Sequence, residues 1–267
     1  MHEYEEFDDE IYEKMKMRIR SETDRKIFQQ VFDSKTFEAM QALANKGSID
    51  VLEHIISTGK EAHVFIASDV SGNKRAVKIF KKETTHFKKM NQYIDGDPRF
   101  RNLATDRRGL VLAWARKEYK NLVAASNAHL AVPLPIAIRE NTIVMEFIGE
   151  GENAAPRLKD IVPAEKDLIE FRKQTVQFLS GLYLAGLVHA DLSEYNILVK
   201  GKELTMIDFA QALLLNHPRA KEFFERDVAN MASYFSKAGL ETSYGELYAM
   251  VKKEKERSAK VPRLRKT

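Results

Sequence analysis

The sequence contains no cysteine. This absence excludes disulfide bonds, thiolate zinc sites and a cysteine nucleophile, and it fits the reducing cytoplasm. Long apolar runs are missing too, since nowhere do the roughly eighteen apolar residues of a membrane-spanning helix follow one another. The first residues carry charges where a signal peptide has its apolar segment. We therefore expect a cytoplasmic protein without a membrane partner.

The net charge is small, at +4, but it is distributed unevenly along the 267 residues. The first ten residues are rich in acidic side chains, and residues 252–266 are rich in basic ones. A basic end of this kind can contact RNA phosphates. A solvated helix end explains the same residues equally well, so both interpretations stay open. The length accommodates one large or two small domains with a buried core.

The most informative residues are an acid, an amide and a second acid at a spacing typical of phosphoryl transfer. Asp191 is followed by Asn196 and then by Asp208. Phosphoryl transfer needs a carboxylate that orients or deprotonates a hydroxyl, and an amide oxygen and a carboxylate that hold magnesium on the nucleotide phosphates. The three residues match these tasks in this order. Each alone is also an ordinary turn or strand-end residue, but the spacing of the set favours phosphoryl transfer.

A β-hairpin is predicted between the amide and the second acid. Apolar residues at 197–199 and 204–207 flank a polar turn at 200–203. The two strands would bring Asn196 and Asp208 together at one end of the hairpin.

Upstream, short apolar and β-branched runs between residues 49 and 80 predict three consecutive antiparallel strands. The segment Ser57-Thr58-Gly59-Lys60 lies between the first two, where small residues let backbone amides approach a triphosphate. A polar turn with one glycine is common, so this signal is weak alone. Lys78 lies within the third strand, where its ammonium either reaches solvent or meets a buried anion such as phosphate.

Helices are predicted around these strands. Residues 1–48 have helical spacing of apolar residues, and Asp33 or Ser34 is placed to cap the second helix of this segment. Residues 82–109 lack clear periodicity and are expected to form a flexible loop.

The rest of the chain is predicted to hold a helix over 110–125 that carries Glu118, two strands within 133–147, and three later helices. The later helices are expected at 166–185, 220–238 and 243–257. A β-rich part therefore precedes a helical part, which is the α+β class.

Together these residues resemble the protein kinase fold, with a glycine-containing loop, a strand lysine, a helix glutamate, a His-x-Asp loop and an Asp-Phe motif. More narrowly, the segments 57–62, 192–196 and 207–211 resemble the RIO family of atypical serine/threonine protein kinases. The short helical N-terminus resembles the first RIO subfamily, in its archaeal form, because the second carries a winged-helix domain there. The resemblance implies a bilobal fold with an antiparallel β-rich N-lobe, extra N-terminal helices and a reduced helical C-lobe.

The resemblance also implies a role for each matching residue. Asp191 would be the catalytic base, and Asn196 and Asp208 would hold Mg²⁺, or Mn²⁺ in its place. In this family the aspartate at position 208 is also reported to accept phosphate as an aspartyl-phosphate. Met145 falls at the gatekeeper position, so that the backbone of Glu146 and Ile148 would bind adenine. The residues expected to bind ATP are Ser57, Thr58, Gly59, Lys60, Lys78 with its ion-pair partner Glu118, Met145, Glu146 and Ile148.

The chain departs from ordinary kinases in several places. There is no Gly-x-Gly-x-x-Gly motif, Ala190 replaces the usual arginine, and Ala210 replaces the glycine after the metal motif. The interval between Asp208 and Asp227 is too short for an activation loop with an Ala-Pro-Glu motif. RIO proteins share these deletions, which weaken the inference that a protein or peptide is the physiological substrate. His63 and Phe65 stand where asparagine and tyrosine are frequent, with little expected chemical consequence.

By this resemblance the chain divides into four parts. These are an N-terminal helical extension (1–48), an N-lobe (49–148) with the loop 82–109, a reduced C-lobe (149–258) and a basic tail (259–267).

The implied function is an ATP- and magnesium-dependent serine/threonine kinase and ATPase. It would autophosphorylate and act on the maturing small ribosomal subunit, in contact with its rRNA and proteins. A small-molecule kinase of the aminoglycoside or choline type is an alternative, although the segment 192–195 resembles RIO loops rather than theirs. A non-catalytic ribonucleoprotein-binding scaffold is a further alternative, which retention of Lys78, Asp191, Asn196 and Asp208 disfavours.

Overall fold

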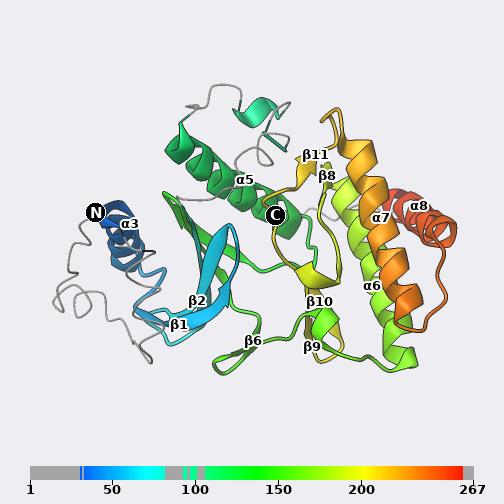
Figure 1. Ribbon diagram of the computed structural model, residues 1–267, viewed down its shortest axis with the longest axis horizontal. Coiled ribbons are helices and arrows are strands. Elements are labelled where there is room, and N and C mark those ends of the chain that lie inside the picture. The colour runs from blue at the N-terminus through cyan, green and yellow to red at the C-terminus, as the bar shows by residue number, and fades with distance from the viewer. Residues whose placement is uncertain (1–30, 32, 82–92, 95–96, 101–105, 261–267) are drawn as a thin grey trace. The chain divides into compact units, whose positions relative to one another are not determined.

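The computed structural model in Figure 1 describes residues 31, 33–81, 93–94, 97–100 and 106–260. The chain forms two compact units. The first comprises Met1–Lys88, Leu103–Arg116 and Leu134–Ala154, and the second comprises Lys89–Asn102, Lys117–Pro133 and Ala155–Thr267. The predicted first helix, most of the loop and most of the basic tail lie outside the described residues.

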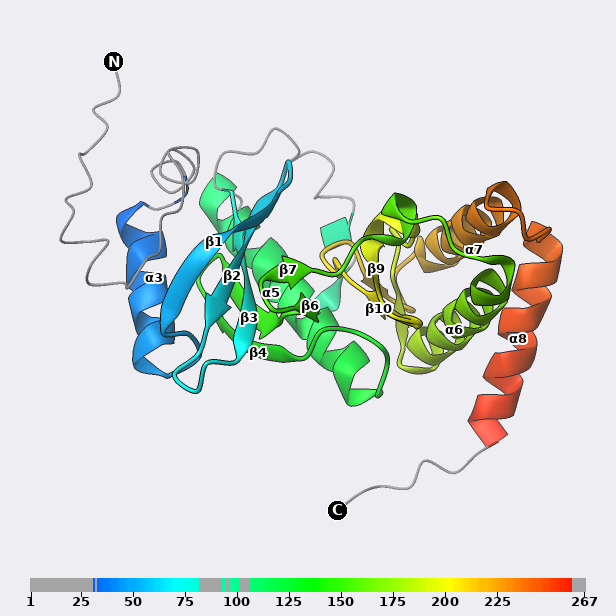
Figure 2. The ribbon, with the colours of Figure 1, turned by 90° about the horizontal axis from the view of Figure 1, so that it is seen from below.

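A five-stranded antiparallel sheet forms the centre of the first unit, with the strand order β1-β2-β3-β5-β4. Its strands β1, β2 and β3 are labelled in Figure 2. The strands are β1 (Val51–Thr58), β2 (Ala62–Ser68), β3 (Lys74–Phe80), β4 (Pro135–Arg139) and β5 (Thr142–Glu146). The predictions of three strands between 49 and 80 and of two within 133–147 are therefore confirmed. Their β-branched and aromatic residues suit the pleated, half-buried surface of a sheet.

Helix α3 (Ser34–Asn45) packs against β4 and β5. Its N-terminus is capped by Asp33, whose side chain accepts a hydrogen bond from the backbone N–H of Thr36 at 2.9 Å. Of the two candidates for this cap, Asp33 is therefore the correct one. Met40 and Leu43 on the inner face of α3 join the core of the sheet.

Helix α5 (Arg107–Asn127) begins three residues before the predicted start at 110. The reason is an N-cap that the sequence analysis missed, since Asp106 accepts the N–H of Gly109 at 3.0 Å through its side chain. The expectation of a loop up to residue 109 is wrong at this end. It is also wrong at residues 93–94, which are helical and buried, and at the short helix η1 (Pro98–Phe100).

Three long helices lie side by side in the second unit in both views (Figures 1 and 2). They are α6 (Glu165–Leu184), α7 (Ala220–Lys237) and α8 (Tyr244–Lys260). All three were predicted, although α8 continues three residues beyond the expected end at 257. Gly186 follows α6 with a φ of +84°, a backbone conformation that favours glycine.

The predicted hairpin of the second unit consists of β9 (Ile197–Lys200) and β10 (Glu203–Met206). A second pair, β8 (Leu187–Val188) with β11 (Leu213–Leu214), was not predicted. This pair closes the segment between residues 188 and 213 into a loop, and all three residues of the acid-amide-acid set lie within it.

Shorter elements complete the described fold. They are the hairpin of β6 (Gly149–Glu150) with β7 (Asn153–Ala154), and the 3₁₀ helices η2 (Leu158–Asp160) and η3 (Glu194–Asn196). Within the described ranges, no helix combines the length and the apolar character needed to cross a bilayer.

Candidate active site

The carboxylate of Asp191 is held by two side-chain amides within the second unit. Asn196 donates from Nδ2 to Asp191 Oδ2 at 3.1 Å and to the Asp191 carbonyl at 2.9 Å. Gln211 donates from Nε2 to the same Oδ2 atom, also at 3.1 Å. One carboxylate oxygen therefore accepts both amides, which fixes the orientation of the group. Gln211 was part of the resemblance to the RIO family, but the sequence analysis gave it no role.

The β9–β10 hairpin brings Asn196 beside the residue before Asp208, as predicted. Met206 pairs with Ile197 at the open end of the hairpin, and the Ile207 N–H donates to the Asn196 carbonyl at 3.0 Å. Asp208 follows directly with a φ of +67°. A residue other than glycine in this left-handed region costs about 1 kcal/mol or more, and such strain is common at functional sites.

Asp227 holds the backbone on both sides of Asp191. This fully buried α7 carboxylate accepts the N–H of Ala190 at 2.8 Å and the N–H of Leu192 at 2.9 Å. The neighbouring Arg226 donates to the Ala190 carbonyl. Burial raises the pKa of Asp227 to about 7, although the two N–H donors and Arg226 act in the opposite direction. This role of Asp227 was not predicted, because no local pattern in the sequence marks a contact across 37 residues.

His189 is a neutral, buried part of the same loop. Burial lowers its pKa to about 4, against the favourable influence of Asp208. Its Nε2 lies 3.1 Å from the Ile207 carbonyl, which requires the proton on that nitrogen, and its ring centre lies 4.9 Å from that of Phe209. His189 therefore supports both residues that flank Asp208.

The residues expected to bind nucleotide in the first unit lie at the ends of its strands. Ser57 and Thr58 end β1, and the turn that follows is closed by a hydrogen bond from the Gly59 N–H to the Ala62 carbonyl at 2.9 Å. Lys60 lies in this turn. Lys78 is buried in β3, with its ammonium 5.1 Å from the ring centre of Phe80.

The gatekeeper Met145 is buried near the end of β5, and Ile148 lies just beyond that strand. The N–H of Glu146 is used within the sheet, since it donates to the Leu134 carbonyl at 2.9 Å. This N–H is therefore occupied, and the binding of adenine by the Glu146 backbone stays a prediction.

Glu118 is buried in α5, in the part of the helix that belongs to the second unit. Its expected partner Lys78 belongs to the first unit, so their ion pair stays a prediction.

Two residues of β2, His63 and Phe65, differ from those that are frequent in the family. Phe65 is fully buried in the core. Burial, assisted by Lys81, lowers the pKa of His63 to about 4, so this histidine is neutral near pH 7.

The polar side chains near Asp191 in the second unit suit magnesium, and a lysine of the first unit suits phosphate. Because the Nδ2 atom of Asn196 is directed to Asp191, its Oδ1 is the atom available for a metal. Together with a carboxylate oxygen of Asp208, it offers the hard oxygen ligands that Mg²⁺ prefers. Lys78 is the residue type that commonly pairs with nucleotide phosphates.

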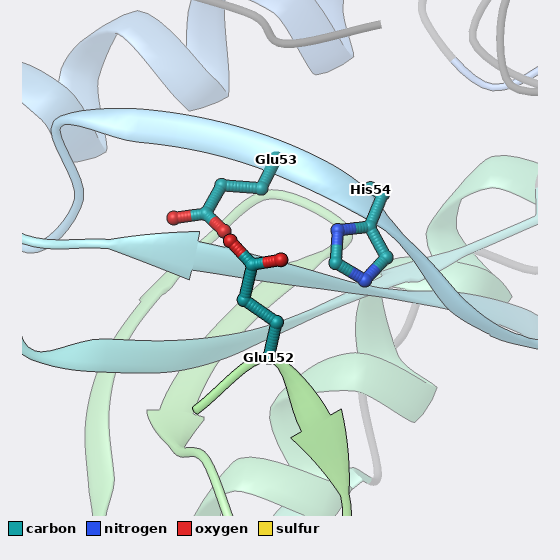
Figure 3. A group of neighbouring side chains, drawn as sticks. All are labelled: Glu53, His54 and Glu152. Atoms are coloured by element: carbon teal, nitrogen blue, oxygen red, sulfur yellow. The ribbon is translucent and has the colours of Figure 1, made fainter. Parts of the chain in front are cut away.

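A second group of potential metal ligands lies in the first unit. Figure 3 shows Glu53 and His54 on β1 and Glu152 in the turn between β6 and β7, with ligand atoms within 4.8 Å of one another. Lys74 already supplies a cation, because its ammonium lies 2.5 Å from Glu53 and 3.9 Å from Glu152. Ser68 also donates to Glu53. We therefore assign this group a structural role, which is to compensate the buried Glu53 carboxylate.

Comparison with known proteins gives consistent results. A family model described as the RIO domain matches residues 63–247. The chain is 39% identical over 244 residues to the RIO-type serine/threonine-protein kinase Rio1 of Haloferax volcanii, covering 91% of this chain and 83% of that protein. It is 38% identical over 221 residues to the human serine/threonine-protein kinase RIO1, covering 82% of this chain and 39% of the human protein.

The fold is similar to that of a solved RIO kinase. The structure of the Rio2 kinase-ADP/Mg²⁺-phosphoaspartate complex from Chaetomium thermophilum matches with a TM-score of 0.64 at 21% identity, covering 87% of this chain and 73% of that one. The predicted α+β kinase-like fold is thereby confirmed. The matched domain and the similarity to Rio1 proteins lead to one conclusion: the chain belongs to the RIO family of serine/threonine protein kinases.

Proposed function

We propose that this protein is an autophosphorylating RIO-type kinase and ATPase that acts on maturing small ribosomal subunits in the cytoplasm. Membership of a kinase family implies the use of ATP and Mg²⁺. The observation that carries the catalytic proposal is the loop of the second unit, in which Asn196 contacts Asp191 and is joined by the hairpin to the residue before Asp208.

Asp191 is the residue that we expect to orient an acceptor hydroxyl and to take its proton as the hydroxyl oxygen bonds to the γ-phosphorus and the bond from phosphorus to the ADP oxygen breaks. Asn196 and Asp208 would hold Mg²⁺, which neutralises charge on the phosphates when bound. Mn²⁺ is expected to replace it, because the same oxygen ligands suit both ions. Lys78 would hold the phosphates from the first unit. These roles require a fixed carboxylate at position 191, which the two amide donors provide.

Asp208 is also our candidate for a phosphate acceptor. In this route a carboxylate oxygen of Asp208 bonds to the γ-phosphorus as the bond to the ADP oxygen breaks. Water then hydrolyses the acyl phosphate, which releases phosphate and restores the carboxylate. The net reaction is ATP hydrolysis. The related Rio2 complex from Chaetomium thermophilum contains ADP, Mg²⁺ and a phosphoaspartate, which supports the proposal.

The catalytic proposal is tested by incubating the protein with γ-labelled ATP and Mg²⁺, and then treating it with hydroxylamine, which cleaves acyl phosphates but not phosphoserine. We expect both resistant and labile label in the wild type. Asp208→Asn should lose both kinds, whereas Asp191→Asn should lose mainly the resistant label. Asp160→Asn is a control, because this half-exposed carboxylate of η2 pairs only with Lys159 among the described ion pairs.

If the wild type shows neither label nor phosphate release, the kinase and ATPase proposal is wrong. The same conclusion follows if Asp208→Asn behaves like the Asp160 control.

The proposed ribosomal partner is supported by the basic side chains of α8. Lys252, Lys253, Arg257 and Lys260 are exposed on this helix. Cations of this kind bind RNA phosphates with an affinity that falls as salt rises.

This partner is tested by measuring binding to a small-subunit rRNA fragment over a range of salt concentrations. The double variant Lys252→Glu/Lys253→Glu should bind more weakly and with a smaller salt dependence. Binding should also differ between ATP and ADP if hydrolysis drives the cycle. RNA binding that is the same with ATP and with ADP would instead favour a non-catalytic ribonucleoprotein-binding scaffold.

A further inference from the structure

Two buried side chains of α5 hold the backbone that follows Asp208. Lys117 donates to the Ala210 carbonyl at 2.9 Å and also to the Ala212 carbonyl. Asn121, one helical turn later, donates to the carbonyls of Phe209 at 3.0 Å and Ala212 at 2.8 Å. All of these groups lie in the second unit. Three carbonyls of one short segment are therefore fixed from a single face of one helix.

Burying this lysine is costly for the fold. Lys117 is fully buried, and burial lowers its pKa to about 7, although Asp97 and Glu118 favour its charged form. An apolar side chain of similar length would avoid the cost of removing an ammonium from water. The lysine is therefore better explained by the two carbonyls that it binds than by its contribution to packing.

Gln211 lies between the two carbonyls that Lys117 binds. Its position in space is therefore set by the carbonyls of Ala210 and Ala212 on either side. From there its side chain reaches Asp191 Oδ2 at 3.1 Å. A continuous series of hydrogen bonds thus runs from α5 through residues 209–212 to the carboxylate of Asp191.

We propose that Gln211 is a positioning residue that orients Asp191, and that Lys117 and Asn121 act through the backbone of residues 209–212 to hold Gln211 in place. The inference rests on the proposed role of Asp191. Gln211 occupies one oxygen of the carboxylate together with Asn196, so that the orientation of the other oxygen is defined. A displacement of about 1 Å at such a group can reduce the rate about 100-fold.

The proposal is tested with Gln211→Ala and Gln211→Glu, using the rate of hydroxylamine-resistant autophosphorylation at saturating ATP. The alanine variant loses the donor, and we expect its rate to fall by about 10- to 100-fold. The glutamate variant keeps the size of the side chain but places a second carboxylate next to Asp191, so its rate should be lower still. The KM for ATP should stay within about twofold, because the described hydrogen bond of the Gln211 side chain goes to Asp191 and not to a proposed nucleotide-binding residue.

This order of rates separates positioning from packing. If Gln211 only filled space, the glutamate variant would be more active than the alanine variant, and that result would overturn the proposal. Gln174→Ala is the matched control, because the Gln174 side chain on α6 also hydrogen-bonds to another segment of the second unit, the backbone of Lys202 and Leu204 at the turn end of the β9–β10 hairpin. It should retain the wild-type rate.

The action of Lys117 through Gln211 is tested with Lys117→Met. If the residues act in series, the double variant Lys117→Met/Gln211→Ala should be about as slow as the slower single variant. If the rate losses of the two single variants multiply in the double variant, Lys117 does not act through Gln211.

A readout without turnover separates this inference from the proposed function. The side-chain amide of Asn196 shares Asp191 Oδ2 with Gln211, so its ¹⁵N–¹H resonances should shift in Gln211→Ala and stay unchanged in Gln174→Ala. An unchanged Asn196 signal in Gln211→Ala would overturn the positioning role. A shifted signal in a protein that transfers no phosphate would leave the contact established and refute the proposed function instead.

Discussion

Replacing Asp227 by asparagine should separate what this buried carboxylate does for stability from what it does for catalysis. In the wild type its two oxygens accept the N–H groups of Ala190 and Leu192. Asp227→Asn keeps one acceptor oxygen and turns an NH₂ group towards the other N–H. Below pH 4, where the carboxyl of the wild type is neutral, we expect the variant to be less stable by about 1–3 kcal/mol, the cost of a buried polar group without its partner.

The sign of the pH dependence follows from the raised pKa. The folded protein keeps the Asp227 proton up to about pH 7, whereas the unfolded chain releases it near 3.8. Wild-type stability therefore contains a contribution that falls as the pH rises from about 4 to 7. A shift of about three pKa units corresponds to about 4 kcal/mol. The stability advantage of the wild type over Asp227→Asn should shrink by up to this amount across that range and can reverse near neutrality.

The measurement is urea unfolding of both proteins at several pH values between 4 and 8, together with the rate of autophosphorylation. The difference between the two proteins isolates Asp227, because other titrating groups such as His189 are common to both. We expect the variant to lose most of its activity at pH 7 even where its stability equals that of the wild type. A constant stability difference across the pH range, or full activity in the variant, would refute this reasoning.

Three further predictions concern other parts of the structure. His189→Gln removes a group whose pKa falls from 6.5 to about 4 on folding. The stability advantage of the wild type over this variant, measured by urea unfolding, should therefore rise by about 3 kcal/mol as the pH increases from 4 to 6.5. Asp33→Ala removes the cap on Thr36 and should lower stability by about 1 kcal/mol, with Ser34→Ala as a near-neutral control. Lys74→Met leaves the buried Glu53 without its cation and should cost about 2 kcal/mol in the same assay, which Glu53→Gln in the same chain should largely restore; no restoration would contradict the structural role of this pair.

The sequence predicted those parts of the fold in which local pattern and final structure agree. The strands around Lys78 and the helices α6, α7 and α8 carry enough residues for their periodicity to be read. The strands β8 and β11 have two residues each, which is too few for any period, and their pairing depends on contacts between distant segments. The burial of Tyr93 was missed for the same reason, because it depends on a distant segment. The Tyr93 ring packs against Phe223 of α7 with 5.2 Å between the ring centres, within a stretch whose local sequence resembles a loop.

The residues of the candidate site also differ in how far local sequence predicts their contacts. The hairpin predicted between Asn196 and Asp208 is confirmed, and it brings Asn196 to the residue before Asp208, because only a short turn connects its strands. Gln211, Lys117 and Asp227 were not given their roles, since each reaches its partner from 20 or more residues away. The sequence thus identified the proposed chemical groups, and the structure identified the groups that hold them.

The loop at Ala190 is held together differently from that of kinases with a phosphorylated activation loop. Many kinases gain activity when a phosphorylated activation loop pairs with an arginine. Position 190 offers only a methyl group, and in the described part of the chain the nearby Arg226 is committed to the Ala190 carbonyl. The loop around Asp191 is therefore assembled by contacts that require no phosphate. Asp227 and Arg226 of α7 thus do for this loop, through the backbone of residues 190 and 192, what a phosphate does in those kinases.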